Sequence, residues 1–82
     1  PLVGARNGLP VCEAFGRNLR AIRKSKGFSQ ERLAYEAGID RSYVGKIERG
    51  EVNVTIEKLY LLAECLRCHP SELLLDQPRL KE

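Results

Sequence analysis

Hydrogen-bond donors gather on one side of a short segment near the middle of the chain. At about 100° per residue, a helix would place Ser42, Lys46 and Arg49 on one face. Tyr43 would flank this face, and Arg41 would lie at its N-terminal tip. An arginine can donate two hydrogen bonds at once to O6 and N7 of guanine, and a lysine can donate as a point charge. These side chains could contact base edges, provided that the chain presents them to a DNA groove.

The opposite face of the same segment is apolar, because Val44 and Ile47 fall together on it. A polar face opposite an apolar stripe is also the pattern of an ordinary surface helix. This segment alone therefore does not distinguish DNA binding from solvation, and the residues before it make the distinction.

Residues 29–50 predict two short helices joined at a glycine. Leu33, Ala34 and Ala37 recur at helical spacing, as expected for a buried face. Gly38 follows directly, at a position where a left-handed backbone costs a glycine little. The small side chain of Ala34 would allow the two helices to cross closely.

Each of these two helices is preceded by a residue suited to cap it. The hydroxyl of Ser29 and the carboxylate of Asp40 can each accept a hydrogen bond from a free N–H at a helix start. Two helices joined by a tight glycine turn form a helix-turn-helix. In this motif the outward face and N-terminal tip of the second helix meet the base edges of the major groove. The base contacts that we expect are Arg41, Ser42, Tyr43 and Lys46.

The positions that build this segment resemble those of lambda repressor and Cro, the XRE family of DNA-binding domains. The matching residues are Gln30, Leu33-Ala34, Ala37-Gly38-Ile39, Val44, Ile47-Glu48 and Gly50. The resemblance covers roughly residues 15–75 and is most specific over residues 29–50. Within the family, residues 33–35, 40–44 and 47–49 are similar to the controller proteins of restriction-modification systems, which are small dimers that bind paired operator sites.

The resemblance implies roles for several further polar residues. Gln30 would contact a phosphate, and Arg49 would lie near the DNA backbone. Glu48 lies on the inner side of its helix and needs a partner, because an unpaired buried charge is costly; the resemblance implies that this partner is Arg23. The chain departs from some controllers at Val52, where they carry a basic residue. Since an amide in the following loop can also reach a phosphate, the expected backbone contacts are Gln30, Arg49, Asn53 and Ser29.

The remaining residues predict three more helices and no strand. An apolar stripe that includes Phe15, Leu19 and Ile22 predicts a helix over about 11–26. Thr55 would cap a helix over about 56–67, with a core stripe of Ile56, Leu59, Leu62, Ala63 and Leu66. Pro70 suits the first position of a final short helix.

The expected fold is therefore all-α, a compact five-helix lambda repressor-like domain with a central helix-turn-helix. The 82 residues suffice for one small domain. We expect the domain to span residues 11–76, between a flexible N-terminal segment of residues 1–10 and a C-terminal tail of residues 77–82.

Basic residues are concentrated in the half that holds the motif. Residues 1–49 contain ten Lys and Arg against five Asp and Glu, whereas residues 50–82 contain four against six. Such a distribution is typical of a phosphate-binding face. The sequence shows no apolar run near 18 residues and no secretion signal, so we expect a cytoplasmic protein without membrane association.

The last part of the chain is rich in leucine, and one small core cannot bury all of these side chains. An exposed apolar patch favours association, so we expect a homodimer. Two-fold symmetry would place the two second helices about 34 Å apart, which matches a palindromic operator. The expected interface residues are Leu61, Leu74, Leu75 and Leu80.

Residues 65–69 match the C-x-x-C-H pattern of covalent haem attachment. The chain holds a single histidine, no methionine and no export signal, and Leu66 belongs to a core stripe. Zinc would lack a fourth ligand, and a disulfide at helical spacing would distort the helix. We therefore expect no cofactor and no metal, with Cys65 and Cys68 as reduced, packed thiols; a redox role for this pair stays open.

Three functions remain as hypotheses. We find no nucleophile beside a credible base and no phosphate loop, so we expect no enzymatic activity. The leading hypothesis is a sequence-specific transcriptional regulator of double-stranded DNA, of the restriction-modification controller type, with RNA polymerase as a further candidate partner. An antitoxin would use the same DNA face and also bind a toxin protein. A pure protein-interaction domain would favour a neutral or acidic outer face, whereas Arg41, Lys46 and Arg49 are basic.

Overall fold

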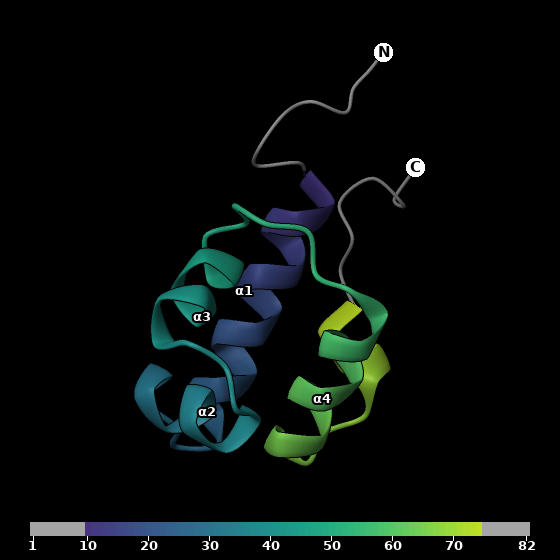
Figure 1. Cartoon of the computed structure of the whole chain (residues 1–82). Coiled ribbons are helices and arrows are strands. Elements are labelled where there is room, and N and C mark those ends of the chain that lie inside the picture. Colours follow the sequence, from purple (N-terminus) through teal and green to yellow (C-terminus); the bar gives the residue numbers. More distant parts are fainter. Residues whose placement is uncertain (1–9, 75–82) are drawn as a thin grey trace.

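Four α-helices and a 3-10 helix make up residues 10–74, the part of the chain that the computed structural model describes (Figure 1). The elements are α1 (Pro10–Ser25), α2 (Gln30–Ala37), α3 (Arg41–Glu48), α4 (Ile56–Leu66) and the 3-10 helix η1 (Pro70–Leu74). The described residues contain no strand, which confirms the all-α prediction. The fifth predicted helix is present as η1, and its 3-10 form is usual for so short a run.

The ends of the helices differ little from the prediction. α1 begins at Pro10, so this residue belongs to a helix and not to the expected flexible segment; proline is well suited to a first helical position. α1 ends at Ser25 and α4 at Leu66, one residue before the predicted ends. The remainder of the expected N-terminal segment and the expected tail of residues 77–82 lie outside the described residues.

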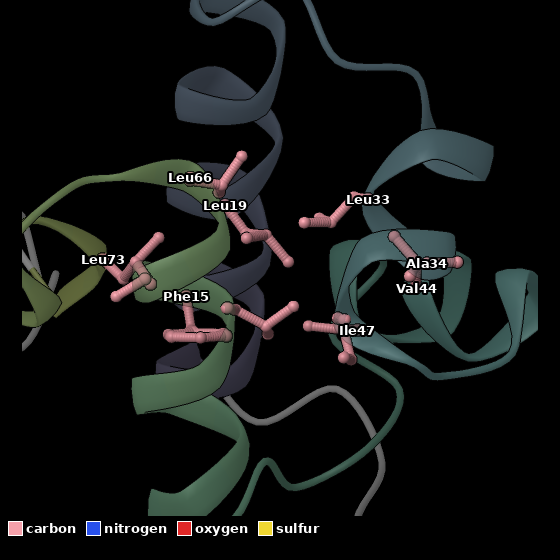
Figure 2. Packing of buried hydrophobic residues seen from close by; sticks show 11 residues of the cluster. Phe15, Leu19, Leu33, Ala34, Val44, Ile47, Leu66 and Leu73 are labelled. Atoms are coloured by element: carbon pink, nitrogen blue, oxygen red, sulfur yellow. The ribbon is translucent and has the colours of Figure 1, made fainter.

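Every element contributes at least one fully buried apolar side chain to a single core (Figure 2). The largest fully buried side chains are Leu19, Leu33, Val44, Ile47, Leu62, Leu66 and Leu73. α2 and α3 pack against each other, α3 lies on α1, and η1 packs between α1 and α4. Because burial of apolar area stabilises a fold in proportion to that area, this shared core fixes how the two motif helices are held.

The turn between α2 and α3 has the predicted geometry. Ser29 precedes α2, and its hydroxyl accepts a hydrogen bond from the backbone N–H of Arg32 at 3.0 Å. Gly38 adopts a left-handed conformation with φ of 70°. The next residue, Ile39, donates its N–H to the carbonyl of Ala34 at 3.0 Å, which closes the helix end. The helix-turn-helix is therefore present where the sequence predicts it.

A close contact between α1 and α3 depends on Gly16, which the sequence patterns did not indicate. A Cβ atom at this position would overlap the backbone carbonyl oxygens of Ile47 and Glu48. The absence of a side chain thus allows α1 to cross directly over the C-terminal end of α3. The spacing of apolar residues carries no information about such an approach, because glycine is neutral in that pattern.

The predicted core stripe of α4 is wrong at its first residue. Ile56 is 73% exposed, and Tyr60, one turn later, is 59% exposed. Leu62, Ala63 and Leu66 form the buried side of the helix instead. A helix buries only one stripe of its surface, and packing on α2 turns the side that holds Ile56 outward.

Candidate nucleic-acid interface

The core fixes the orientation of α3. Val44 and Ile47 are almost completely buried, so the side of the helix that carries them faces inward. Four of the side chains predicted to contact DNA are exposed on the outer side of this segment: Arg41, Ser42, Lys46 and Arg49. The outward surface of α3, named here the α3 face, consists of these four residues and the partly buried Tyr43.

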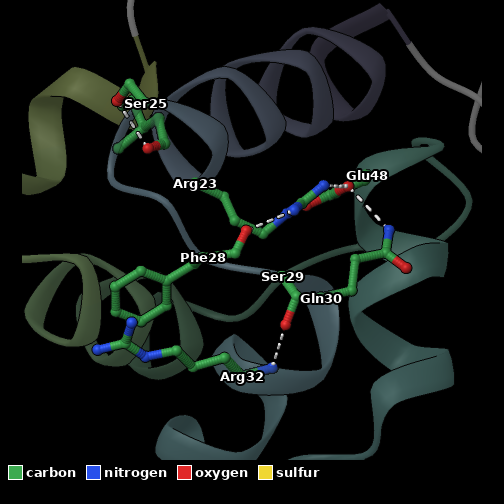
Figure 3. Close-up of polar contacts among 8 residues, drawn as sticks. Arg23, Ser25, Phe28, Ser29, Gln30, Arg32 and Glu48 are labelled. Atoms are coloured by element: carbon green, nitrogen blue, oxygen red, sulfur yellow. Dashed lines mark hydrogen bonds and ion pairs between the residues drawn. The ribbon is translucent and has the colours of Figure 1, made fainter.

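A buried ion pair holds the inner side of α3 to α1 (Figure 3). Arg23 Nε lies 2.6 Å from Glu48 Oε2, and Arg23 Nη2 donates to Glu48 Oε1 at 3.1 Å. Arg23 Nη1 donates to the carbonyl of Phe28 at 2.8 Å. Both side chains are less than a tenth exposed. The pair expected between Arg23 and Glu48 is thus present, and it also ties down the loop that leads into α2.

Gln30 joins the same network. Its Nε2 donates to Glu48 Oε1 at 3.0 Å, and the side chain is drawn beside this carboxylate in Figure 3. A glutamine amide carries two N–H groups, so one of them remains to meet a phosphate. The network therefore holds Gln30 at the first turn of α2 in one orientation, close to the α3 face.

Arg41 is paired with a residue of the other motif helix. Its Nε lies 3.0 Å from Glu31 Oε2, and both side chains are more than half exposed. Glu31 belongs to the first turn of α2, and Arg41 is the first residue of α3. The sequence pattern does not indicate a pair between Glu31 and Arg41, because ten residues and a turn separate the two.

Asp40 occupies the predicted cap position, but its side chain does not cap α3. Its carboxylate accepts a hydrogen bond from the hydroxyl of Ser42 at 2.8 Å instead. The predicted capping bond is therefore wrong: the hydroxyl two residues on provides the donor. This bond fixes the rotamer of one of the expected base-contacting residues.

Arg49 is bound by the residue that follows the turn after α3. Its Nε and Nη2 donate to the two carboxylate oxygens of Glu51 at 2.8 and 3.4 Å. The hydrogen bond from Arg49 lowers the pKa of Glu51, and Lys46 acts in the same direction. Gly45 leaves room for the guanidinium, since a Cβ there would lie 3.2 Å from Arg49 Nη1. Two cations of the α3 face are thus partly neutralised by one carboxylate.

Gly50 sets the position of this carboxylate. It has φ of 75°, and the N–H of Glu51 donates to the carbonyl of Lys46 at 2.9 Å across the turn. A Cβ on Gly50 would lie only 2.7 Å from the side chain of Glu13 on α1. The turn therefore packs against α1, and its backbone places Glu51 at the end of α3.

Tyr43 is held between the core and a lysine of α4. Its ring packs against the core, and Lys58 Nζ lies 5.9 Å from the ring centroid. A shallow hollow of about 450 Å³ separates α3 from α4 here, lined by Ile39, Asp40, Ser42, Tyr43, Lys46 and Lys58. Lys58 adds a positive charge beside the α3 face. The sequence pattern did not indicate it, because it lies on another helix, between Ile56 and Leu59, which were assigned to the core.

Asn53 is exposed, and its side chain is bonded to α1. Its side-chain carbonyl accepts a hydrogen bond from the thiol of Cys12 at 3.2 Å. It also lines an apolar hollow of about 370 Å³ with Phe15, Leu59 and Leu74. This arrangement turns its carbonyl toward α1, so a phosphate contact would use the amide nitrogen.

The four leucines expected at a dimer interface are distributed unequally. Leu61 is half-buried and packs on the core, whereas Leu74 is 46% exposed. Leu75 and Leu80 lie outside the described residues. The most exposed apolar side chains of α4 are Ile56 and Tyr60, which the sequence analysis did not assign to an interface.

The thiols of Cys65 and Cys68 are half-buried and free. Burial raises the pKa of both, with nearby glutamates adding to the rise. Within residues 10–74, no group of three or more His, Cys, Asp or Glu side chains could hold a metal ion. In the same range, none of the helices has both the length and the apolar character needed to cross a membrane.

Comparison with known proteins places this geometry in a family context. The helix-turn-helix family HTH_3 matches residues 19–73. The control protein C.SmaI of Serratia marcescens is 38% identical over 69 residues, which are 84% of this chain and 82% of that protein. The control protein C.BamHI of Bacillus amyloliquefaciens is 41% identical over 61 residues, which are 73% of this chain and 75% of that protein.

A solved structure of a controller protein is also similar to this chain. The restriction-modification controller protein C.AhdI from Aeromonas hydrophila superposes with a TM-score of 0.74 at 48% identity. The match covers 76% of this chain and 94% of that one.

Proposed function

The chain belongs to the helix-turn-helix family HTH_3 and is a DNA-binding transcription regulator, and we propose that it acts as a homodimer on a palindromic operator. We further propose that it is a controller of a restriction-modification system, the kind of protein named among its relatives. RNA polymerase and a toxin protein remain partners that only the sequence analysis suggests.

The orientation of α3 carries this proposal. Buried Val44 and Ile47 on one side leave Arg41, Ser42 and Lys46 exposed on the other. A helix held in this way fits the major groove of DNA, where each base pair presents a distinct pattern of donors and acceptors. Arg41 at the N-terminal tip lies where helices of this motif approach the bases.

The proposal for a dimer is supported by exposed apolar side chains toward the C-terminal half of the described residues. Ile56, Tyr60 and Leu74 are each more than 45% exposed. Contact between copies would remove this area from water, and the second copy would double the DNA contact. One short helix alone offers few base contacts, and a paired site raises the affinity because a second helix adds its own contacts.

Selection of bound sequences from a random pool of DNA duplexes tests the function. We expect enrichment of a sequence with two half-sites related by a dyad, centred about one helical turn, or roughly 34 Å, apart. Sedimentation of the free protein at micromolar concentration should give the mass of a dimer. A pool without an enriched sequence would contradict the proposed regulator, and enrichment of a single half-site would contradict the palindrome.

A further inference from the structure

We propose that Glu31 is a specificity-determining residue of the DNA interface, because its carboxylate holds the guanidinium of Arg41 by the Nε edge and leaves the terminal nitrogens for a guanine. This inference rests on the function proposed above. It assigns a base-positioning role to an acidic residue of α2, the helix that is not inserted in the groove.

The two residues are held at a fixed spacing by the motif. Glu31 is in the first turn of α2 and Arg41 begins α3, with Nε 3.0 Å from the carboxylate. Leu33 and Val44, near them in sequence, are completely buried and hold the two helices together. The pair therefore bridges two elements whose relative position the core determines.

Glu31 contacts the Nε side of the Arg41 guanidinium, and this decides which N–H groups remain available for a base. A guanidinium has five N–H groups, one on Nε and two on each Nη. Nε is the atom of Arg41 closest to Glu31, and within residues 10–74 neither Nη1 nor Nη2 of Arg41 donates a hydrogen bond, so their four N–H groups remain. Two of them are enough for the paired hydrogen bonds to O6 and N7 of guanine. Holding Arg41 before it meets DNA also reduces the side-chain freedom that binding removes.

Arg49 shows a similar arrangement on the same α3 face. Its Nε and Nη2 both bind Glu51, at 2.8 and 3.4 Å, so both N–H groups of Nη1 and one of Nη2 remain. Both arginines are thus held by a carboxylate on the Nε side, and Arg41 is the one that lies at the N-terminal tip of α3.

The ion pair between Glu31 and Arg41 contributes little to the stability of the fold. The side chain of Glu31 is 68% exposed and that of Arg41 is 58% exposed, and pairs this exposed contribute little to folding. Beside DNA, however, the carboxylate is repelled by phosphates in every sequence, whereas the orientation of Arg41 helps only where a guanine is in place. The repulsion lowers the affinity for operator and random DNA alike, so the orientation of Arg41 is the effect that increases the preference for the operator.

Glu31→Gln tests this inference, with Glu36→Gln as a matched control. Glu36 lies on the same helix and also pairs with an arginine, since Arg32 Nε is 3.1 Å from its carboxylate. Both variants remove one negative charge, so a general electrostatic effect would appear in both. We expect Glu31→Gln to lower the preference for the selected operator over a random duplex by about 5- to 10-fold, and Glu36→Gln to leave it within about twofold.

Glu31→Asp separates geometry from charge. It keeps the carboxylate but shortens its reach by one methylene group, and we expect it to lose operator preference while its affinity for random DNA stays that of the wild type. Thermal melting followed by circular dichroism verifies that each variant is folded at the temperature of the titration.

Replacing single operator guanines by 7-deazaguanine removes the N7 acceptor at one position at a time. We expect the wild type to lose affinity at one guanine of each half-site, and Glu31→Gln to be insensitive at that same guanine. An operator preference that is unchanged or higher in Glu31→Gln would overturn the role of Glu31 and leave the regulator intact. A wild type without preference for any sequence would overturn the proposed function, and the role of Glu31 with it.

Discussion

Arg23 of α1 and Glu48 of α3 bind each other through two hydrogen bonds, Nε to Oε2 at 2.6 Å and Nη2 to Oε1 at 3.1 Å, with both side chains less than a tenth exposed. The carboxylate also accepts from Gln30, and the guanidinium also donates to the carbonyl of Phe28. One buried pair thus links α1, the loop before α2, the start of α2 and the end of α3. The position of the α3 face relative to the rest of the domain depends on these bonds.

Removal of one partner of this pair should be strongly destabilising. We expect Glu48→Ala or Arg23→Ala to lower the free energy of unfolding by about 3–5 kcal/mol, since either change strands a buried charge. The double variant Arg23→Ala with Glu48→Ala should lose less than the sum of the two single changes. Urea unfolding of the four proteins provides the measurement, and additive losses would show that the pair is not coupled.

Gly16 and Gly45 form a matched pair for a second test. A methyl group at position 16 would overlap backbone carbonyl oxygens, which cannot move aside, whereas at position 45 it would meet only the flexible end of Arg49. We expect Gly16→Ala to destabilise the domain by about 1–3 kcal/mol. Gly45→Ala should be neutral or stabilising by up to about 1 kcal/mol, because alanine favours a helix. Thermal melting of the two variants measures this difference in stability. Equal stabilities would contradict the close approach of α1 and α3.

Gln30 should contribute to affinity and not to sequence preference. We expect Gln30→Ala to weaken binding to the operator and to a random duplex by the same factor, about 3- to 10-fold, as for the loss of one hydrogen bond to a phosphate. The dependence of affinity on salt should stay constant, because the side chain is uncharged. Arg49→Gln, in contrast, should reduce the salt slope by up to about one. A changed operator preference in Gln30→Ala would contradict a backbone contact.

The half-buried thiols of Cys65 and Cys68 should react slowly with an alkylating reagent. Burial raises the pKa of both, so a smaller fraction is thiolate at a given pH than in an unfolded chain, and the thiolate is the reactive form. We expect iodoacetamide to modify them more slowly in the folded protein than in urea at pH 8. The difference should narrow as the pH rises through the raised pKa. Rapid labelling of the folded protein at pH 7 would favour a reactive, redox-type role for this pair.

The helices follow from patterns that the sequence displays, and the family resemblance implies Arg23 as the partner of Glu48. Leucine and alanine at helical spacing, a capping serine and a glycine at the turn locate the motif. Glu48 on an inner face already implies a buried partner.

Other features depend on how the elements meet. Gly16 is a contact point only because α3 crosses it. Lys58, Glu31 and Glu51 join the α3 face through neighbouring elements and a backbone turn. Ile56 lies at the outer edge of its stripe, where periodicity alone does not decide burial.

The most direct test of the central claim compares Arg41→Ala with the wild type in titrations of the selected operator and a random duplex. If the α3 face contacts bases through Arg41, the variant should lose about 1–3 kcal/mol of discrimination, roughly a 5- to 150-fold loss of operator preference, while its helical content stays that of the wild type. Arg32→Ala, an exposed arginine of α2 paired with Glu36, serves as the control and should keep the preference. An operator preference in Arg41→Ala equal to that of the wild type would contradict the account.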